Sequence, residues 1–273
     1  MAPRYPGSLT PRRVRTPRQI AALTAREALG GHVLNAGVLG AVESANWGMS
    51  RLGRWLPARV RCSCCGWAGR TFLHVRNRLR TAWNSACPHC DSRSRHRGLA
   101  LLIPDLLSER VPARVLHVSP EIVLRRVVEP LAATYDTSDF GDADVTYPRE
   151  DLTNPRIRPG SYDVILCNHV LEHVKDDAAA VAGMAWILGG DGLAIVTIPG
   201  IFTRHETIRF PDDSLGGHWR DYGNDVVNLF TRYFEEVELV DLSARDHAPD
   251  GLSYGIRRGE IAFVLSSPRA VAL

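Results

Sequence analysis

Short apolar runs alternate with helical segments from about Arg114 to the end of the chain, and this alternation predicts parallel βαβ units. The expected strands are 115–118, 133–137, 144–147, 163–167, 193–198, 237–242 and 261–266, and the expected helices are 120–131, 177–188 and 221–234. The run DVILC at 163–167 has an almost wholly apolar body, which is typical of a strand covered on both faces of a parallel sheet. The pattern therefore predicts an α/β fold.

The first hundred residues have a different texture. Residues 1–18 are rich in Pro and Arg without apolar periodicity, which predicts a disordered tail. Helix formers occupy 16–55, and the pair Gly30–Gly31 interrupts them, so two short helices are expected there. We expect three parts, namely a basic tail with a helical segment at 1–58, a cysteine-bearing module at 59–98 and the α/β domain at 99–273.

Charge is distributed unevenly, although the formal net charge is only +3. Residues 1–97 carry 17 Arg and three acidic residues, whereas the rest of the chain has an excess of 11 acidic residues. A basic head of this kind suits phosphate-rich partners such as RNA. Lys175 is the only lysine, so the alternative is a general preference for Arg with a solvated tail. No aromatic-interleaved recognition motif accompanies the charge.

Signals for membranes and secretion are missing from the sequence. No stretch approaches the roughly 18–20 uninterrupted apolar residues that a membrane span requires. The N-terminus also lacks the apolar run and small-residue cleavage site of a secretory signal. We therefore expect a cytoplasmic protein.

Four cysteines form two C-x-x-C pairs, Cys62 with Cys65 and Cys87 with Cys90, and 21 residues separate the two pairs. Each pair places two thiolates close together on a tight turn, so the two pairs can complete a tetrahedron around zinc. Four sulfur ligands leave no position open for water. The spacing therefore predicts a structural Zn²⁺ site that stabilises a segment with little core of its own.

Other interpretations of these cysteines remain open at this point. Disulfides are the alternative to zinc, although a reducing cytosol opposes them. Cys64 lies between two expected ligands and is interpreted as a spectator, with its register against Cys62 or Cys65 left open. His89 is an alternative ligand, and Cys167 in the expected strand 163–167 is assigned to the core.

Polar residues follow several of the expected strands in the α/β part. A doubly wound sheet binds its ligand beyond the carboxyl ends of the strands, where the strand order reverses. Asp139 lies about twenty positions beyond the first loop, where an acidic residue takes the hydroxyls of a ribose. Asp151 is placed to receive an adenine amino group. The candidate cofactor-binding residues are His117, Ser119, Glu121, Asp139, Asp151, Leu152 and Asn168.

Residues from about 115 to 266 resemble a class I S-adenosylmethionine-dependent methyltransferase, most sharply over 163–199. More narrowly, the two C-x-x-C pairs, residues 92–97 (SRSRHR), and the runs VLHVSPE, DLT and HWRDYG resemble a bacterial subgroup that joins a zinc-ribbon-like segment to this domain. The resemblance implies a Rossmann-like seven-stranded sheet with helices on both faces, its last two strands forming an antiparallel pair. It also implies S-adenosyl-L-methionine as the cofactor.

The first loop departs from the pattern of that family. Most members have G-x-G-x-G there, because glycines let the backbone approach the amino-acid end of the cofactor. This chain has Ser119 at the first glycine position and Glu121 at the second. We expect the Glu121 carboxylate to meet the ammonium group of the cofactor.

The acceptor side has three candidate catalytic residues, His169, Glu172 and His218. His169 is the best general base, because it follows the strand that faces the donor, and the alternative is a packing or positioning role. Trp219 and Tyr222 cover either the bound ligands or the core. The run from His169 to His173 also spells H-x-x-E-H, the inverted zinc-protease signature, but that motif needs a long helix and here it directly follows a strand.

Taken together, these residues predict a methyltransferase that acts on a small-molecule or sugar acceptor. One alternative is an RNA methyltransferase that uses the basic, zinc-containing head for binding, which would be steeply salt-dependent. The other is a methyltransferase-like scaffold whose altered first loop no longer binds the cofactor.

Overall fold

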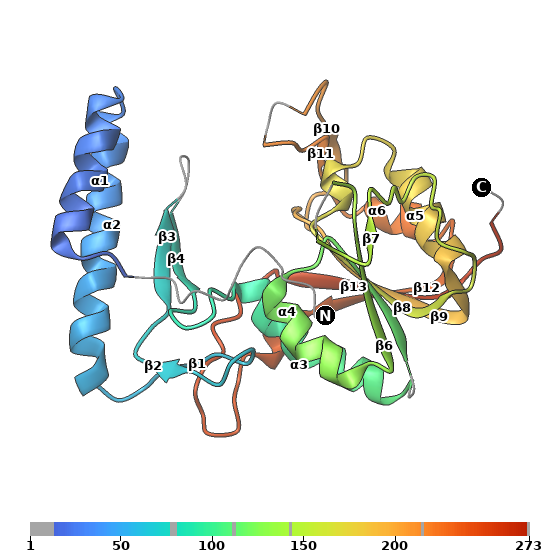
Figure 1. Ribbon diagram of the computed structural model, residues 1–273, viewed down its shortest axis with the longest axis horizontal. Coiled ribbons are helices and arrows are strands. Elements are labelled where there is room, and N and C mark those ends of the chain that lie inside the picture. Colours follow the sequence, from blue (N-terminus) through green and yellow to red (C-terminus); the bar gives the residue numbers. More distant parts are fainter. Residues whose placement is uncertain (1–13, 77–80, 111–112, 142–143, 214–215, 272–273) are drawn as a thin grey trace. The chain divides into compact units, whose positions relative to one another are not determined.

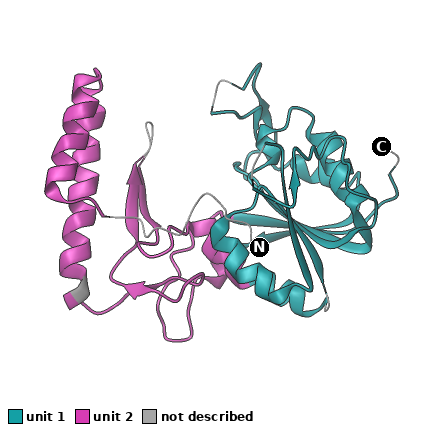
Figure 2. Cartoon of the chain, viewed as in Figure 1, with its two compact units in different colours: residues 1–6, 102–242, 261–273 teal, residues 7–101, 243–260 magenta. Residues whose placement is uncertain are grey.

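The computed structural model describes residues 14–76, 81–110, 113–141, 144–213 and 216–271 (Figure 1). Most of the expected disordered tail, 1–18, lies outside the described residues. The chain packs into two compact units (Figure 2). Among the described residues, unit 1 lies within 102–242 and 261–271, and unit 2 lies within 14–101 and 243–260. In the described ranges, no helix is both long and apolar enough to span a membrane.

Unit 1 is built on a seven-stranded sheet with the order β12-β13-β9-β8-β5-β6-β7. The bounds are Arg114–Val118 (β5), Thr134–Asp139 (β6), Tyr147–Pro148 (β7), Tyr162–Asn168 (β8), Leu188–Thr197 (β9), Phe234–Asp241 (β12) and Ile261–Pro268 (β13). The five strands from β5 to β9 pair in parallel, and β13 runs antiparallel to both of its neighbours. The predicted Rossmann-like methyltransferase sheet is therefore confirmed. Its order reverses between β5 and β8, which lie side by side.

Two helices of unit 1, α4 (Ile122–Val128) and α6 (Val226–Phe230), are shorter than the sequence pattern predicts. The unit also contains α5 (Asp177–Ile187) and the C-terminal half of α3 (Ser94–Ser108), with single 3-10 turns η2 (Glu129–Leu131) and η3 (Leu171–His173). Figure 1 shows α4 on one side of the sheet and α5 and α6 on the other. The core between β8, β9 and α5 is fully apolar, with Ile165, Met184 and Val196 completely buried.

Two predicted elements of unit 1 are wrong in extent. The helix expected at 221–234 shrinks to α6, because Asp221 pairs in β11 (Arg220–Asp221) with β10 (Ile208–Arg209) and Phe234 already begins β12. The strand expected at 144–147 is reduced to β7. Thr146 meets β6 through reciprocal side-chain bonds with Thr137, so these bonds replace the regular backbone ladder.

Unit 2 begins with the two predicted helices, α1 (Pro17–Leu29) and α2 (Val33–Leu52), which pack against each other. Thr16 and Gln19 form a capping box at the start of α1, and Gly31 turns the chain with a φ of +84°. After the 3-10 turn η1 (Gly53–Trp55), the unit continues as two antiparallel hairpins, β1 (Val60–Arg61) with β2 (Ala68–Gly69) and β3 (Leu73–Arg76) with β4 (Thr81–Ala86). The second helix has 20 residues and is therefore not short.

The segment between β12 and β13 packs with unit 2, although the strands on either side of it belong to unit 1. It includes the 3-10 turn η4 (Leu242–Arg245). The backbone of Arg61 donates to the carbonyl of Ser253 at 2.9 Å, and the Ser253 amide donates to the carbonyl of Arg59 at 3.1 Å. The cysteine-bearing module is therefore completed by a segment that lies far along the chain.

Candidate functional site

The two C-x-x-C turns of unit 2 have the same backbone conformation. In the first, the amide of Gly66 donates to the carbonyl of Cys62 at 2.8 Å, and in the second the amide of Asp91 donates to the carbonyl of Cys87 at 2.9 Å. The residue after the second cysteine has a positive φ in both turns, +75° at Gly66 and +56° at Asp91. These turns are equivalent, as expected for paired halves of one metal site.

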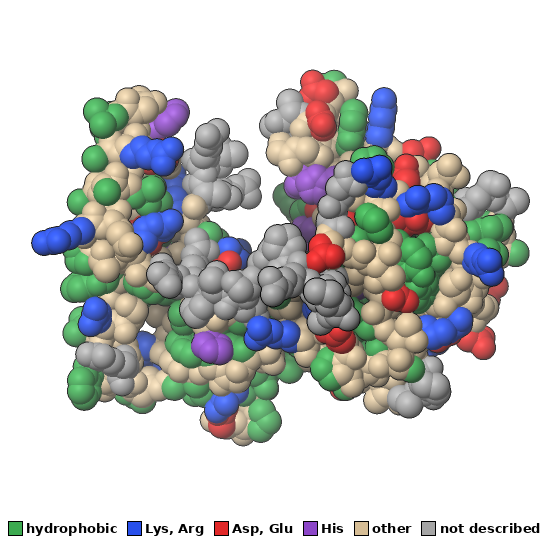
Figure 3. All heavy atoms as spheres, in the orientation of Figure 1, with side chains coloured by type: hydrophobic (Ala, Val, Ile, Leu, Met, Phe, Trp, Pro, Cys, Tyr) green, Lys and Arg blue, Asp and Glu red, His purple; other side chains and the backbone are tan. Residues whose placement is uncertain are grey.

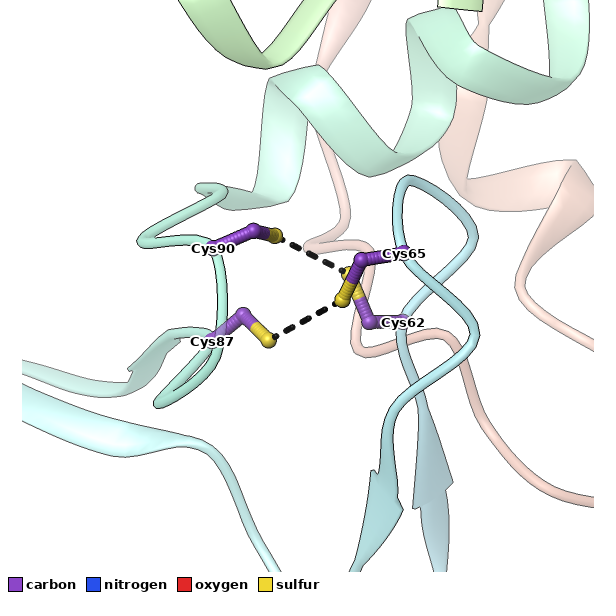
Figure 4. A group of neighbouring side chains, drawn as sticks. All are labelled: Cys62, Cys65, Cys87 and Cys90. Carbon is purple, nitrogen blue, oxygen red and sulfur yellow. Dashed lines mark hydrogen bonds between the residues drawn. The ribbon is translucent and has the colours of Figure 1, made fainter. Parts of the chain in front are cut away.

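All four sulfur atoms point toward one another (Figure 4). The Sγ atoms of Cys62 and Cys90 are 3.6 Å apart, those of Cys65 and Cys87 are 3.7 Å apart, and all four lie within 4.8 Å of one another. A disulfide would need about 2.05 Å. Four sulfurs at about 2.3 Å from a tetrahedral ion lie about 3.8 Å from each other. The donor set and spacing therefore fit a tetrahedral thiolate-binding metal.

Cys64 and His89 lie beside the cluster and make contacts of their own. The Cys64 thiol donates to the backbone carbonyl of His96 at 3.4 Å, so it is directed to the protein, as expected for a spectator. The amide of His89 donates to the sulfur of Cys87 at 3.4 Å. This places the main chain of His89 beside the cluster, whereas four sulfurs already complete it.

A pocket of unit 1 lies at the carboxyl ends of the central strands and has a volume of about 580 Å³. Its lining comes from the end of β5 and from the residues that follow β5, β6, β7 and β8. It is lined by Val118, Ser119, Phe140, Glu150, Asp151, Leu152, Thr153, His169, Val170, His173, Val174, Lys175, Asp176 and Trp219. The pocket therefore lies where the strand order reverses, the position that doubly wound sheets use for ligands.

The first loop adopts a left-handed backbone without a glycine. Ser119 follows β5 directly and has a φ of +46°. Its amide donates to the carbonyl of Ser138 at 2.8 Å, and its hydroxyl donates to Asp139 Oδ2 at 2.9 Å. The other oxygen of Asp139 accepts the amide of Gly141 at 2.8 Å. The serine thus occupies a conformation that favours glycine, and its bond to Asp139 offsets part of the cost.

The expected adenine-binding residues line the pocket. Asp151 Oδ1 accepts both the amide and the hydroxyl of Thr153 at 2.8 Å, which fixes the carboxylate in a turn. Leu152 is buried beside it and also lines the pocket. Ser119 and His169 are the other predicted site residues that line it.

The remaining cofactor candidates lie beside the pocket rather than on its described lining. His117 is completely buried, and its Nδ1 is 2.7 Å from the hydroxyl of Tyr135. Glu121 precedes α4 as its N-cap residue. Asn168 is buried at the end of β8, where its Oδ1 accepts the hydroxyl of Thr197 at 2.9 Å. The contacts of His117 and Asn168 are with other residues of the protein.

The three acceptor-side candidates lie close together. His169 Nδ1 is 3.1 Å from Glu172 Oε1. Because a carboxylate only accepts, this contact puts the imidazole proton on Nδ1 and leaves the lone pair on Nε2. The Glu172 side chain is only 1% exposed. His169 itself has a φ of +53° and its side chain is 31% exposed, so it can meet a ligand in the pocket.

The inverted protease signature does not have its helical context. Its last residues form η3, a single turn of three residues, and His169 lies in the connection before it. His173 faces His218 instead, with ring centroids 4.7 Å apart and nearly perpendicular ring planes. Sequence reasoning did not bring these two histidines together, because they lie far apart along the chain.

Several pocket residues had no sequence signal of their own. Phe140 is 75% exposed, and the only available sign was its position directly after the expected ribose ligand Asp139. The ammonium group of Lys175 lies 5.2 Å from the centroid of the Trp219 ring. Both residues line the pocket, so the tryptophan of the run HWRDYG covers one side of it. Tyr222 from the same run is instead buried in the core and donates to Asp177 at 3.1 Å.

Comparison with known proteins agrees with this geometry. Residues 106–196 match a family model described as a methyltransferase domain, a stretch that runs from α3 into β9 and includes β5, β6, β8 and the loops of the pocket. Over this stretch the chain is similar to that family, and the predicted resemblance is confirmed there. No curated protein matches the chain in sequence.

Similar solved structures include a 1,6-didemethyltoxoflavin-N1-methyltransferase from Burkholderia thailandensis with bound 1,6-didemethyltoxoflavin and S-adenosylhomocysteine. It is 13% identical with a TM-score of 0.45, and the match covers 65% of this chain and 79% of that one. An S-adenosylmethionine-dependent methyltransferase from Mesorhizobium loti is 18% identical with a TM-score of 0.43, covering 63% of this chain and 98% of that one. A methyltransferase from Bacillus halodurans is 13% identical with a TM-score of 0.42, covering 61% and 99%.

Proposed function

We propose that the chain is an S-adenosylmethionine-dependent methyltransferase that acts on a small-molecule or sugar acceptor. The observation that carries the proposal is the pocket of about 580 Å³ at the reversal point of a methyltransferase-type sheet. This volume falls within the roughly 300–1,000 Å³ of typical small-molecule sites. The cofactor supplies an electrophilic methyl group on a sulfonium, so the protein has mainly to bind, orient and exclude water.

The described lining offers the features that a nucleoside needs. Phe140 presents an exposed ring and Leu152 a buried aliphatic surface, which suit the two faces of a base. Asp151 accepts hydrogen bonds at the same place, which suits an exocyclic amino group. Asp139 lies beside this lining, next to Phe140, and its carboxylate has lone pairs beyond those used by Ser119 and Gly141, which suit ribose hydroxyls.

His169 is the proposed general base. Its contact with buried Glu172 fixes the tautomer, so Nε2 is free to take a proton from an acceptor hydroxyl or amine in the pocket. The negative charge of Glu172 stabilises the imidazolium that results. Glu172 acts through His169 in this step and is a positioning residue.

The four-cysteine cluster is proposed to hold a structural Zn²⁺ through Cys62, Cys65, Cys87 and Cys90. Four thiolates fill a tetrahedron, so the ion would have no open position for catalysis. Its role would be to hold the two turns together in a part of unit 2 that has few large apolar side chains.

A small acceptor is favoured over RNA by the distribution of charge. On the face shown in Figure 3, the Arg side chains of α1 and α2 lie scattered among apolar and neutral side chains rather than in one basic patch. One of the 17 arginines of the head, Arg97, is completely buried and contributes nothing to a surface potential.

Calorimetric titration with S-adenosylmethionine and with S-adenosylhomocysteine tests the proposal. Asp151→Asn keeps the acceptor that fixes Thr153 but replaces the second oxygen by an amide donor, which opposes an adenine amino group. We expect about tenfold or greater loss of affinity for both ligands. Glu238→Gln on β12, an exposed carboxylate outside the pocket, should leave the affinity unchanged. Absence of binding to the unmodified protein would leave only the scaffold alternative.

Labelled methyl transfer then separates the acceptor classes. The purified chain is incubated with methyl-tritiated cofactor and with either the low-molecular-weight fraction or the RNA fraction of a cell extract. Label in the small-molecule fraction alone supports the proposal. Label in RNA, lost steeply as salt is raised, would transfer the assignment to the RNA alternative.

A further inference from the structure

We propose that Glu172, His173 and His218 form a second metal site, which binds a first-row divalent cation beside the pocket of unit 1. One donor atom from each residue lies within 4.8 Å of the other two. Glu172 and His173 are neighbours on η3, and His218 lies on the connection between β10 and β11. Two imidazoles and one carboxylate, with further positions open, are a donor set typical of such ions.

The buried carboxylate lacks a partner that a cation would supply. Glu172 Oε1 is engaged by His169 at 3.1 Å, whereas Oε2 is inaccessible to solvent and has no hydrogen-bond partner among the residues that the structure describes. Leaving a carboxylate oxygen buried and unsatisfied is costly, because it loses its hydration without compensation. A divalent ion bound through Oε1, the oxygen nearer to His173, would offset part of this cost, because its positive charge attracts the whole carboxylate.

The backbone carbonyl of Gly217 orients His173 as a ligand by accepting a hydrogen bond from its Nδ1. Its Nδ1 is 2.9 Å from the carbonyl of Gly217, and because a carbonyl only accepts, the proton lies on Nδ1. The lone pair is then on Nε2, which faces Glu172 Oε1 at 4.0 Å. Two acceptors at this distance do not hydrogen-bond to each other. Ligands about 2.1 Å from one ion lie roughly 3–4 Å apart, so the space between them has the size of a metal ion.

The connection that carries His218 is built to keep this arrangement. Gly217 has a φ of +81°, and a Cβ there would lie 3.1 Å from His173 Nδ1, so a larger residue would disturb the imidazole. The amide of Trp219 donates to the carbonyl of Glu172 at 2.8 Å and ties the connection to η3. A backbone carbonyl that orients a metal-binding histidine is the usual support for such ligands.

The ion would lie where an acceptor enters, because His173 and Trp219 both line the pocket. In this position it would bind two oxygens of the acceptor, such as adjacent hydroxyls, and make one of them more acidic. His169 takes that proton, the oxygen bonds to the methyl carbon, and the electrons of the broken carbon–sulfur bond stay on sulfur. This task of the ion depends on the proposed function, whereas the site itself stands on its own geometry.

Titration of the metal-free full chain with Co²⁺ under reducing conditions tests the site without requiring activity. Cobalt bound to four thiolates gives an intense sulfur-to-metal charge-transfer band, and cobalt bound to nitrogen and oxygen gives only weak ligand-field bands. We expect two equivalents per chain, one of each kind. His218→Ala should lose only the second equivalent, Cys90→Ser should weaken the charge-transfer band and keep the second equivalent, and the exposed His32→Ala should keep both.

A single equivalent in the unmodified protein would overturn the proposal, and so would a second equivalent that survives both His218→Ala and Glu172→Gln. The melting temperature of each variant is measured as a control, to distinguish loss of the ion from loss of the fold. Cofactor binding is measured separately by calorimetry on the same samples. Failure to bind S-adenosylmethionine beside an intact second cobalt site would refute the proposed function and leave the metal site standing.

Discussion

Arg97 allows the sharpest test of how unit 2 is held together. Its guanidinium is completely buried and donates to four backbone carbonyls, those of Ser85 and Ser92 at 3.0 and 2.8 Å, Tyr254 at 2.6 Å and Gly255 at 2.8 Å. These carbonyls belong to β4, the second cysteine turn and the segment between β12 and β13. One side chain therefore joins β4 and the second cysteine turn to a segment that lies 157–158 positions further along the chain.

The charge of Arg97 is balanced by the cysteine cluster. Burial lowers the pKa of this guanidinium, whereas the charges of the cluster cysteines Cys62, Cys87 and Cys90 raise it. Four thiolates around a divalent ion carry a net negative charge, so a buried cation beside them is favourable in the low-dielectric interior. The guanidinium also stacks on Phe72, 3.8 Å from the ring centroid.

Arg97→Met retains a long apolar side chain but leaves the four carbonyls without a donor. At about 1–3 kcal/mol for each unsatisfied group, the gross cost is about 4–12 kcal/mol. Part of this is recovered because the charge is no longer buried, so we expect a net loss of about 3–5 kcal/mol. Arg97→Lys keeps the charge without the planar fork, and it should recover less than half of the loss.

Urea denaturation of the zinc-loaded full chain measures the effect, with tryptophan fluorescence as the signal, since Trp67 packs 5.7 Å from Phe72. Arg61→Met is the matched control. Arg61 pairs with Asp250 in the same segment at 2.6 Å, but both side chains are about 40% exposed, so about 0–1 kcal/mol is expected. Equal losses for Arg97→Met and Arg61→Met would refute the reasoning, as would unchanged hydrogen exchange at residues 253–256.

Two further predictions concern single residues. Ser119→Ala keeps the left-handed backbone and loses the bond to Asp139, so we expect thermal denaturation to show a free energy of unfolding lower by about 2 kcal/mol. Ser119→Gly loses the same bond but relieves about 1 kcal/mol of backbone strain, so its free energy of unfolding should fall roughly half as much. Identical losses for the two variants would contradict this. Burial lowers the pKa of His74, whose Nδ1 accepts the amide of Asn84, so the neutral ring is the native form. The unfolded chain then binds more protons below pH about 6.5, and the free energy of unfolding should fall as the pH drops through that value, but less in His74→Gln.

The sheet was predictable because its strands are buried on both faces. The middle of β8 (VILC, 164–167) and the second half of β9 (LAIV, 193–196) are apolar runs, and such runs are visible in a single sequence. The two-residue strands β10 and β11 and the single turn η3 were not predictable. Contacts with distant segments stabilise these short elements, and their own residues show no periodicity.

The composition of unit 2 was misleading for the same reason. Arg97 counted toward a basic head, yet it is buried, because its partners lie up to 158 positions away. The spacing of the cysteines did predict their cluster, since each C-x-x-C turn is a local structure. The pairing of His173 with His218 depends on the backbone of Gly217, and the glycine alone gave no sign of it.

The first loop shows what the missing glycines meant. The family pattern names a residue type, but the physical requirement is a left-handed backbone directly after a strand. Two neighbouring strands, β5 and β8, end in residues of this kind, Ser119 with a φ of +46° and His169 with a φ of +53°. The backbone therefore turns sharply after each of these two strands, at the point where the strand order reverses, and the pocket lies between the two turns. Non-glycine residues hold such strained conformations only where the surrounding structure compensates them, and strain of this kind gathers at functional sites. Ser119 is compensated by Asp139 and His169 by Glu172, so the residues that stabilise the turns are the same ones that the proposed chemistry uses.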